Sequence, residues 1–260
     1  MSSSPTLSIV IPNWNTGPLL RLCLGSLLRH PPGVPHEVIV VDNGSSDASR
    51  RTAEAAAAAG AIRLLPRDDA RNEGAADHGA ALDLGLREAR GDLLMTLDSD
   101  AWARRPDWFA CFREALGDAA SHAGASKFPG SRAKVFWDRL RGRAAGPEAS
   151  YVRPCHALYR VEALREAGVG FGPWRGPDGR WRTCGEHLHE ELVARGHRPA
   201  FIPHERVAAR VGHLRHATFV LNAERFPGLR ARARRRGERN IRRCLASAEA
   251  RAILSTTPFP

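Results

Sequence analysis

Two aspartates stand two positions apart where an apolar run of the chain ends. Leu93–Leu97 reads Leu-Leu-Met-Thr-Leu, and Asp98 and Asp100 follow it. A nearly continuous apolar run of this length is typical of a strand buried on both faces in a parallel sheet. Ligands of open α/β sheets bind just past the carboxyl ends of such strands. The pair therefore predicts a hard divalent cation with oxygen ligands, although a solvated acidic turn has the same pattern.

A third carboxylate ends another predicted buried strand. Residues 37–41 read Glu-Val-Ile-Val-Val, and Asp42 follows them. Because Asp42 and Asp100 each end a buried strand, both fit a functional group better than a structural one. The first strand is expected over 7–11 and leads into a loop. In that loop Asn15 is equally consistent with a turn residue and with the wall of a pocket.

The chain predicts a sheet that can position these carboxylates. Apolar runs alternate with segments of helical periodicity. The order strand, helix, strand, helix, strand, helix, strand favours a wound, mostly parallel α/β sheet with right-handed crossovers. The expected strands are 7–11, 37–41, 61–65 and 93–97; the expected helices are one capped by Thr16, one capped by Ser45 or Ser46 and ended by Gly60, and 75–89.

The second half of the chain is less regular. Residues 121–154 and 168–185 are rich in Gly, Pro and Arg, and we expect loops there that select the acceptor of a reaction. Trp174 and Trp181 in the second loop are more often core residues than platforms for a sugar ring. The remaining expected elements are helices over 107–116, 161–166, 186–195 and a basic one within 226–245, strands over 155–159 and 199–202, and a disordered tail over 255–260.

Composition limits the classes of protein to which the chain can belong. It has 260 residues, 43% of them hydrophobic, and a formal net charge of +11 carried almost wholly by arginine. That charge favours anionic partners such as phosphates or an anionic membrane surface. The five cysteines are scattered without a C-x-x-C pair, which favours reduced thiols in the cytoplasm. Residues 1–6 do not resemble a leader, and no apolar run is long enough to span a membrane.

Four motifs in order resemble the family 2 glycosyltransferases, which have the GT-A fold. They are Ile11-Pro12-Asn13-Trp14-Asn15, Val40-Val41-Asp42-Asn43-Gly44-Ser45-Ser46-Asp47, the segment 79–91, and Leu97-Asp98-Ser99-Asp100. The resemblance covers roughly the first hundred residues closely and the rest more loosely. It implies a Rossmann-like GT-A domain over 1–225, with a nucleotide-sugar half (1–100) and an acceptor half (101–225). A basic helical extension over 226–260 completes this division.

The resemblance also implies roles for individual residues. Asp42 would contact the base or ribose of the donor, and Asp98 the ribose or sugar. Asp100 and His213 would hold Mn²⁺ or Mg²⁺, and the histidine favours Mn²⁺. The full set of implied donor-binding residues is Pro12, Asn13, Asn15, Asp42, Gly79, Asp83, Asp98 and Ser99.

Two segments depart from the family pattern. The family's acidic pair at a helix start corresponds to Gly185-Glu186-His187, in which histidine replaces the second acid. Glu186 is the expected general base, with His187 and Glu190 in reserve, yet an acid in a first helical turn is also favoured by the helix dipole. The family's Asn-x-Gly segment matches either Asn72-Glu73-Gly74, whose spacing is long, or 78–83, which contains Gly79 and Asp83.

The expected reaction is inverting transfer of a sugar from a UDP- or dTDP-sugar to the hydroxyl of a saccharide, a lipid-linked or a small-molecule acceptor. Cell-surface polysaccharide, glycolipid or secondary-metabolite synthesis would use such a reaction. A sugar-nucleotide nucleotidyltransferase is a rival, but it needs a glycine-rich basic signature after the first strand, where this chain has Asn13-Trp14-Asn15. A second rival interpretation is a non-catalytic, polyanion-binding protein with the same fold.

The basic segment 229–245 allows three interpretations. A solvated arginine face is the simplest. An amphipathic helix lying on anionic lipid is the second, and it would place a cytoplasmic protein at the inner face of the membrane. Nucleic-acid binding is the third, and no specific nucleic acid is expected because the chain lacks a matching fold signature.

Overall fold

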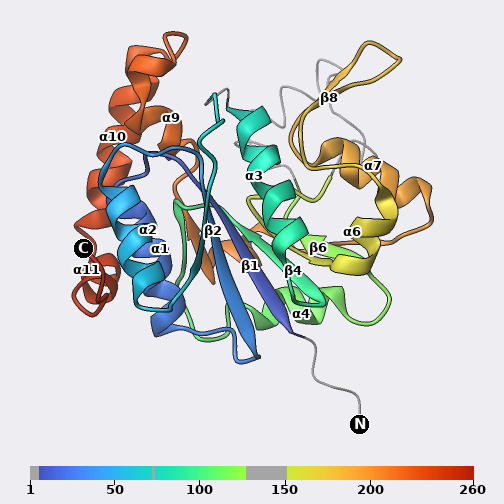
Figure 1. Ribbon diagram of the computed structural model, residues 1–260, viewed down its shortest axis with the longest axis horizontal. Helices are drawn as coiled ribbons and strands as arrows, with labels where there is room; N and C mark the ends of the chain where they lie inside the picture. The colour runs from blue at the N-terminus through green and yellow to red at the C-terminus, as the bar shows by residue number, and fades with distance from the viewer. Residues whose placement is uncertain (1–5, 72–73, 127–150) are drawn as a thin grey trace.

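The computed structural model describes residues 6–71, 74–126 and 151–260. Within them the chain forms a seven-stranded sheet in the order β10-β6-β7-β4-β1-β2-β3, flanked by helices (Figure 1). This is the mixed, mostly parallel α/β sheet that the sequence predicts. Asn72 and Glu73, most of the loop predicted over 121–154, and residues 1–5 lie outside the described part.

The first half of the chain alternates strand and helix as expected. β1, β2, β3 and β4 are mutually parallel in the order β4-β1-β2-β3, with Asn13 opposite Asp42 in the register of β1 and β2. These elements are β1 (Leu7–Asn13), α1 (Pro18–Arg29), β2 (His36–Asp42), α2 (Ala48–Ala58), β3 (Arg63–Pro66), α3 (Ala75–Glu88) and β4 (Leu93–Leu97).

The second half completes the sheet and adds two small ones. β7 is antiparallel to both β4 and β6, whereas β6 and β10 are parallel. Its elements are β5 (Ala101–Ala103), α4 (Ala110–Leu116), β6 (His122–Gly124), β7 (His156–Arg160), α6 (Val161–Ala167), β8 (Trp174–Arg175), β9 (Trp181–Arg182), α7 (Glu186–Ala194), β10 (Pro199–Phe201), α8 (His204–Ala208), β11 (Val211–His213), α9 (Ala217–Leu221), α10 (Ala231–Leu245) and α11 (Ala248–Leu254).

Alternating side chains of the buried strands build one core on each face of the sheet. Ile9 and Ile11 of β1 pack with the apolar sides of α1, α2 and α4. Val10 of the same strand faces the other way and packs with α3, α6 and α7. Because successive side chains of a strand point to opposite faces, a strand buried on both faces is apolar at most positions; the buried hydroxyls of Ser8 and Thr96 are hydrogen-bonded. That explains why the sequence runs of β1, β2 and β4 are continuous.

The caps of α1 and α2 differ from the prediction. Asp47, and not Ser45 or Ser46, caps α2 by accepting from the backbone N–H of Ser49 at 2.9 Å. Ser45 is not free for capping because its hydroxyl donates to Asp42 at 2.6 Å. Thr16 likewise donates its hydroxyl to Asn13, at 2.7 Å, and does not cap α1.

The sequence analysis did not predict β11, which brings His213 next to the end of β4. Residues 199–201 form β10, but β11 follows it and pairs antiparallel with β5, which places His213 opposite Ala101. β5 begins directly after Asp100. The pairing therefore brings a histidine from late in the chain beside the two aspartates that end β4. The predicted loop 168–185 also contains a short hairpin, β8–β9.

The C-terminal tail is ordered, so the prediction of disorder over 255–260 was wrong. Phe259 is only 4% exposed and belongs to the core beside α1 and α2. The carbonyl of Phe259 accepts from Arg21 Nε, and that of Pro260 accepts from the Thr52 hydroxyl, both at 2.6 Å. Figure 1 shows this end of the chain next to α11, beside the first two helices.

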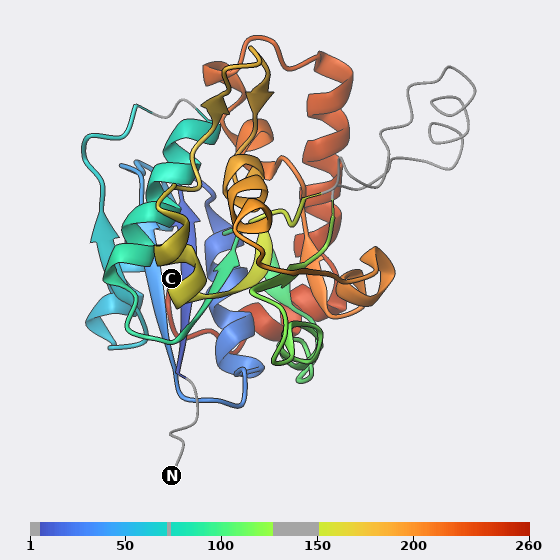
Figure 2. The same ribbon diagram turned by 90° about the vertical axis from the view of Figure 1, so that its right-hand side faces the viewer.

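The basic segment forms α10, which begins at Ala231 and packs against α9 and α11. Figure 2 shows its full length along one side of the molecule. Its apolar side is already covered, because Ile241, Leu229 and Leu245 pack with Leu19 and Val220. In the part of the chain that the structure describes, no helix combines the length and apolar character needed to cross a bilayer.

Candidate active site

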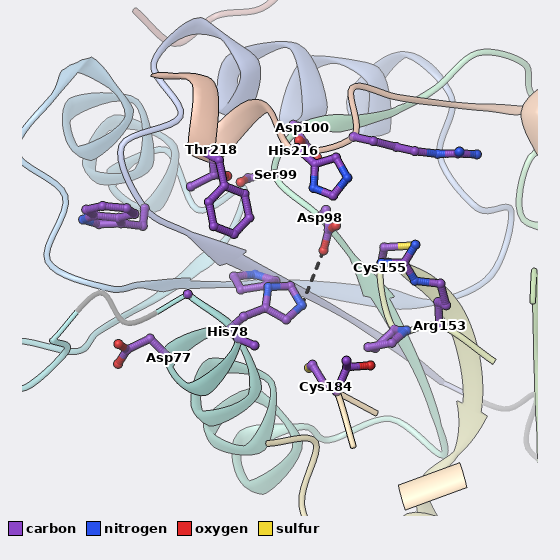
Figure 3. A pocket seen from close by; sticks show the side chains of 18 of the residues that line it. Asp77, His78, Asp98, Ser99, Asp100, Arg153, Cys155, Cys184, His216 and Thr218 are labelled. Carbon is purple, nitrogen blue, oxygen red and sulfur yellow. Dashed lines mark ion pairs between the residues drawn. The ribbon is translucent and has the colours of Figure 1, made fainter. Parts of the chain in front are cut away.

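A cavity of about 280 Å³ opens at the carboxyl ends of β1 and β4. It lies where the rule for open α/β sheets places ligands. The predicted residues on its wall are Pro12, Asn13, Asp98, Ser99, Asp100 and His213; the residues that the sequence analysis did not assign include Trp14, Asp77, His78, Arg153, Cys155, Thr183, Cys184, Arg215 and His216 (Figure 3).

Three side chains form an acidic cluster: Asp98, Asp100 and His213. The imidazole Nε2 of His213 lies 3.2 Å from Asp100 Oδ1 and 3.4 Å from Asp98 Oδ2. Among the described residues, the Oδ1 atoms of both aspartates are buried and have no hydrogen-bond partner. Both oxygens face imidazoles instead: Asp100 Oδ1 is ion-paired with His213, and Asp98 Oδ1 lies 3.6 Å from His78 Nε2. Because a buried carboxylate oxygen without a hydrogen bond is costly, this arrangement favours positive charge at the cluster.

The ionisation of the acidic cluster follows from its charges. Burial favours the neutral form of Asp98, but the imidazoles of His78 and His213 outweigh it and lower the pKa of that carboxyl. Burial also disfavours charge on His213, but Asp100 and Asp98 outweigh it and raise the pKa of the imidazole well above its usual value. The two ionised carboxylates are therefore stabilised by a positive charge beside them. Either protonated His213 or a bound divalent ion provides that charge.

The donor set of the acidic cluster fits a divalent metal. One oxygen from each aspartate and one nitrogen of His213 lie within 4.8 Å of one another. Carboxylate oxygens suit Mg²⁺ and Mn²⁺, and an imidazole ligand favours Mn²⁺. The two Oδ1 atoms without hydrogen bonds are the ligands that a bound ion would satisfy.

Asp42 lies behind the cavity and not in its wall. It is completely buried and accepts from Asn13 Nδ2 at 2.7 Å and from the backbone N–H of Ser45 at 3.0 Å. It thus ties the loop after β1 to the loop after β2. Asn15 also forms a turn, because its backbone φ is 48° and its side chain accepts from Ser46 N at 2.8 Å. Neither residue lines the cavity, and their contact with a donor stays a prediction.

Comparison with known proteins identifies the chain's relatives. Residues 8–168 match the model of the family described as Glycosyl transferase family 2. The chain belongs to this family. The resemblance stated from its four motifs is therefore confirmed.

Individual relatives agree with this assignment. The family 2 chain is 32% identical over 116 residues to the putative glycosyltransferase EpsH of Bacillus subtilis strain 168. The match covers 44% of this chain and 31% of EpsH, so the chain spans about a third of the length of that relative.

A solved structure shares its fold, and a second one aligns more weakly. A mannosyltransferase from Pyrobaculum calidifontis, PcManGT, in complex with GDP-Man and Mn²⁺, aligns with a TM-score of 0.54 and 22% identity, covering 98% of this chain and 80% of that one. The glucosyl-3-phosphoglycerate synthase of Mycobacterium tuberculosis in complex with phosphoglyceric acid aligns with a TM-score of 0.47 and 21% identity, over 74% of this chain and 65% of that one.

Gly79 and Asp83 of the family 2 chain lie below the cavity and do not line it. The Asp83 carboxylate accepts from the backbone N–H of Phe171 at 2.8 Å. A Cβ at Gly79 would lie 2.5 Å from the Cα of Gly172, so only glycine allows the two segments to approach. Both residues hold the segment around 171 against α3. The part of α3 that reaches the cavity is its first turn, with His78 Nε2 3.6 Å from Asp98 Oδ1 (dashed line in Figure 3).

The predicted general bases lie at the start of α7, next to the cavity wall. Glu186 Oε2 accepts from the backbone N–H of Thr183 at 3.0 Å, and its Oε1 accepts from Arg180 at 2.9 Å. Thr183 lines the cavity, but Glu186 itself does not. The ring of His187 stacks on Trp174, with centroids 3.9 Å apart. Glu190, held in reserve, accepts from Arg180 at 2.8 Å. The catalytic roles of these residues stay predictions.

The sequence analysis missed a group of residues at the start of β7. Cys155 lines the cavity, and its backbone carbonyl accepts from the N–H of Asp98 at 2.9 Å. Burial favours the neutral thiol, but the imidazoles of His156 and His213 outweigh it and lower the pKa of Cys155 to about 5. No motif marked these residues, because Cys155 and His156 meet His213 only through the pairing of β7 with β4 and of β11 with β5.

Proposed function

We propose that this family 2 chain transfers a sugar from a nucleoside diphosphate sugar to an acceptor hydroxyl, with inversion at the anomeric carbon. UDP- and dTDP-sugars remain the expected donors. One observation supports the proposal most strongly: two buried aspartate oxygens without hydrogen bonds lie beside His213, in a cavity at the end of β4. The charge and donor atoms of this cluster suit a metal–diphosphate complex.

Each wall of the cavity has a proposed task. Asp100 and His213 would hold Mn²⁺ or Mg²⁺, and Asp98 would contact the ribose or the sugar. The metal, when bound, acts as a Lewis acid that neutralises charge on the diphosphate. Pro12, Asn13 and Ser99 form the adjoining wall and would enclose the nucleoside.

Cationic side chains support a diphosphate as the group bound. Arg153 and Arg215 line the same cavity as His78. Guanidinium groups form charge-assisted hydrogen bonds to phosphate oxygens in a fixed fork geometry. As the glycosidic bond breaks, negative charge grows on the leaving diphosphate, and these groups would stabilise it.

The acceptor would approach from the wall formed by Thr183 and Cys184. Inversion requires a single displacement in which the acceptor oxygen attacks the face opposite the diphosphate, through an oxocarbenium-like transition state. The acceptor hydroxyl must lose its proton to a base. Glu186 remains the proposed base, because its hydrogen bond to Thr183 holds it directly behind this wall.

The acceptor is proposed to be a saccharide, a lipid-linked molecule or a small metabolite, as in cell-surface polysaccharide, glycolipid or secondary-metabolite synthesis. A cytoplasmic chain could meet a lipid-linked acceptor at the inner face of the membrane. The arginines of α10 support that placement: they are exposed while the apolar side of the helix is covered. Attraction to anionic lipid would then be electrostatic, without insertion of an apolar helix face.

Thermal unfolding in the presence of nucleotides tests the proposed donor site. UDP, dTDP and GDP would each be added with Mn²⁺, Mg²⁺ or EDTA; GDP belongs in the panel because PcManGT is complexed with GDP-Man and Mn²⁺. A ligand at a hundred times its Kd adds about 2.7 kcal/mol to the free energy of unfolding. We expect one nucleotide to raise the Tm only when Mn²⁺ or Mg²⁺ is present.

Two variants decide whether the acidic cluster is responsible. Asp100→Ala should abolish the metal-dependent rise in Tm, because it removes the carboxylate that is proposed to hold the metal together with His213. Asp118→Ala, an exposed carboxylate away from the cavity, should retain it. If no nucleotide raises the Tm of the unaltered chain under any condition, the proposed donor site is wrong and a polyanion-binding protein gains support.

A further inference from the structure

A second set of potential metal ligands shares one residue with the acidic cluster. Cys155 and His156, at the start of β7, offer a sulfur and a nitrogen that lie within 4.8 Å of each other and of a His213 nitrogen. The rings of His156 and His213 meet edge to face, with centroids 5.4 Å apart. Figure 3 shows the sulfur of Cys155 at the wall of the cavity. We call Cys155, His156 and His213 the thiol cluster.

His156 provides an independent sign that the thiol cluster binds a ligand. Its side chain is only 6% exposed, yet its Nδ1 is buried without a hydrogen-bond partner among the described residues. Buried imidazole nitrogens almost always have a partner, because desolvation without one costs about 1–3 kcal/mol. A metal ion bound to this nitrogen would remove the cost.

The ligand types select the metal. Thiolate and imidazole are typical Zn²⁺ ligands, whereas the carboxylates of the acidic cluster suit Mn²⁺ and Mg²⁺. Ligand atoms around a tetrahedral Zn²⁺ lie about 3.5 Å apart. The three atoms of the thiol cluster would therefore need to move together slightly. Three protein ligands leave one position for a water molecule or a ligand in the cavity.

We propose that Cys155, His156 and His213 form a Zn²⁺ site whose occupancy excludes metal from the acidic cluster. Binding forms a Zn–S bond to the thiolate of Cys155, and the imidazole of His213, which carries a proton beside the two carboxylates, releases that proton to solvent. Exclusion follows because His213 belongs to both sets and the acidic cluster would lose its imidazole ligand to Zn²⁺. Zn²⁺ would thus oppose donor binding; this consequence rests on the proposed function, whereas the Zn²⁺ site itself does not.

Cobalt provides a direct readout, since Co²⁺ occupies Zn²⁺ sites and a Co–thiolate bond gives a charge-transfer absorption band. The purified full chain should develop this band when Co²⁺ is added and lose it when one equivalent of Zn²⁺ follows. Cys155→Ser should abolish the band. Cys184→Ser is the matched control, because Cys184 lines the same cavity outside the thiol cluster and should leave the band unchanged.

Equilibrium dialysis of Zn²⁺ supplies a second measurement. His156→Asn should weaken Zn²⁺ binding by about tenfold or more, as loss of a ligand must, while Asp98→Asn should retain it. Thermal unfolding of each variant identifies any that fails to fold. The proposal is overturned if the folded Cys155→Ser and His156→Asn variants bind Zn²⁺ as tightly as the unaltered chain, or if Co²⁺ gives no thiolate band.

Displacement of Mn²⁺ tests the exclusion separately. Electron paramagnetic resonance detects free Mn²⁺, so release of bound Mn²⁺ by Zn²⁺ can be followed without a turnover assay. Zn²⁺ should release Mn²⁺ from the unaltered chain at near-stoichiometric amounts, but not from Cys155→Ser. Simultaneous binding of both ions would overturn the exclusion. If the chain bound Zn²⁺ but no Mn²⁺, the proposed donor site would fail while the Zn²⁺ site stood.

Discussion

At the scale of single residues, histidines decide the electrostatics of this chain. His213 is ion-paired with the carboxylates of the acidic cluster, and their charges raise the pKa of its imidazole. His122 shows the opposite behaviour, because it is fully buried without a carboxylate partner, and burial disfavours its charged form. Its Nε2 lies 2.8 Å from Nδ1 of His189, and its Nδ1 lies 2.8 Å from the Ser121 hydroxyl. The same side chain is thus a charge carrier at one site and a neutral hydrogen-bonding group at another.

The His122–His189 pair predicts acid sensitivity. Burial, with the charges of His189 and His197 in addition, lowers the pKa of His122 to about 3. The unfolded chain takes up this proton near pH 6.5, so the stabilisation is complete above pH 6.5 and is lost as pH falls toward 3. At pH 5 the loss amounts to about 2 kcal/mol. Urea unfolding at pH 7 and pH 5 measures it.

A variant separates this loss from the titration of other groups. His122→Gln removes the protonatable ring and should show a smaller drop in the free energy of unfolding between pH 7 and pH 5. His36→Gln alters an exposed histidine and should keep the drop of the unaltered chain. Equal drops in all three proteins would contradict the assignment to His122.

The proposed base gives a second prediction at this scale. Glu186→Gln retains an acceptor for the backbone N–H of Thr183 but cannot take up a proton. We expect kcat to fall by about 10²- to 10⁴-fold, the usual contribution of general base catalysis, with little change in Tm. Steady-state kinetics with the identified donor and acceptor measure the fall. Glu191→Gln, on the same helix, is the control; unchanged turnover in Glu186→Gln would move the role to His187 or Glu190.

At the scale of elements, the pairing of β11 with β5 and the docking of the tail shape the site. β5·β11 brings His213 to Asp100, and α1 lies against both β5 and α11. The tail after α11 fills the space beside α1 and α2, where Thr257 and Phe259 are buried. The C-terminal segment therefore supports the elements that position the acidic cluster. Whether 226–260 should be counted as a separate extension stays a prediction.

Docking of the tail predicts a measurable stability. Phe259→Ala should lower the free energy of unfolding by about 3 kcal/mol, because it removes a buried aromatic ring. Phe201→Ala removes a ring that is 45% exposed and should cost much less. Chemical denaturation of the two variants compares them. Equal, small losses would mean that the tail detaches at little cost.

At the scale of the whole molecule, α10 carries a concentration of exposed positive charge. The chain has a net charge of +11, and α10 exposes a row of arginines on one side of the fold. Its apolar residues pack inward, so deleting 229–245 would disrupt the core beside α9 and would not test membrane binding alone. Substitution of exposed arginines is the cleaner test.

Arg235, Arg239 and Arg242 are exposed at spacings that share one helix face. Replacing all three by glutamine should weaken binding to anionic liposomes by about a hundredfold, since each arginine near such a surface contributes about 1 kcal/mol. Flotation at low and high salt measures this. Glutamine at Arg51, Arg113 and Arg195 makes the same charge change elsewhere and should have a smaller effect; equal flotation of both triple variants would refute a specific role for α10.

The sequence by itself determined the wound sheet, its first four strands and the family. Strands buried on both faces are apolar at most positions, so their runs are visible without a structure. Asp98 and Asp100 were found because they end such a run. His213 was placed by family resemblance, since nothing local distinguishes it among eleven histidines.

Only the tertiary structure decided which residues surround these carboxylates. His78 and Cys155 reach the cavity through helix packing and long-range strand pairing, which leave no local periodicity in the sequence. The structure also shows that Asp42, Gly79 and Asp83 do not line the cavity. Their hydrogen-bonding and packing partners lie on other elements, which the sequence does not reveal. The tail was misjudged for the same reason: its short polar sequence does not reveal that Arg21 and Thr52 bind its carbonyls. Local sequence fixes buried strands, whereas contacts between distant segments depend on how those strands are arranged.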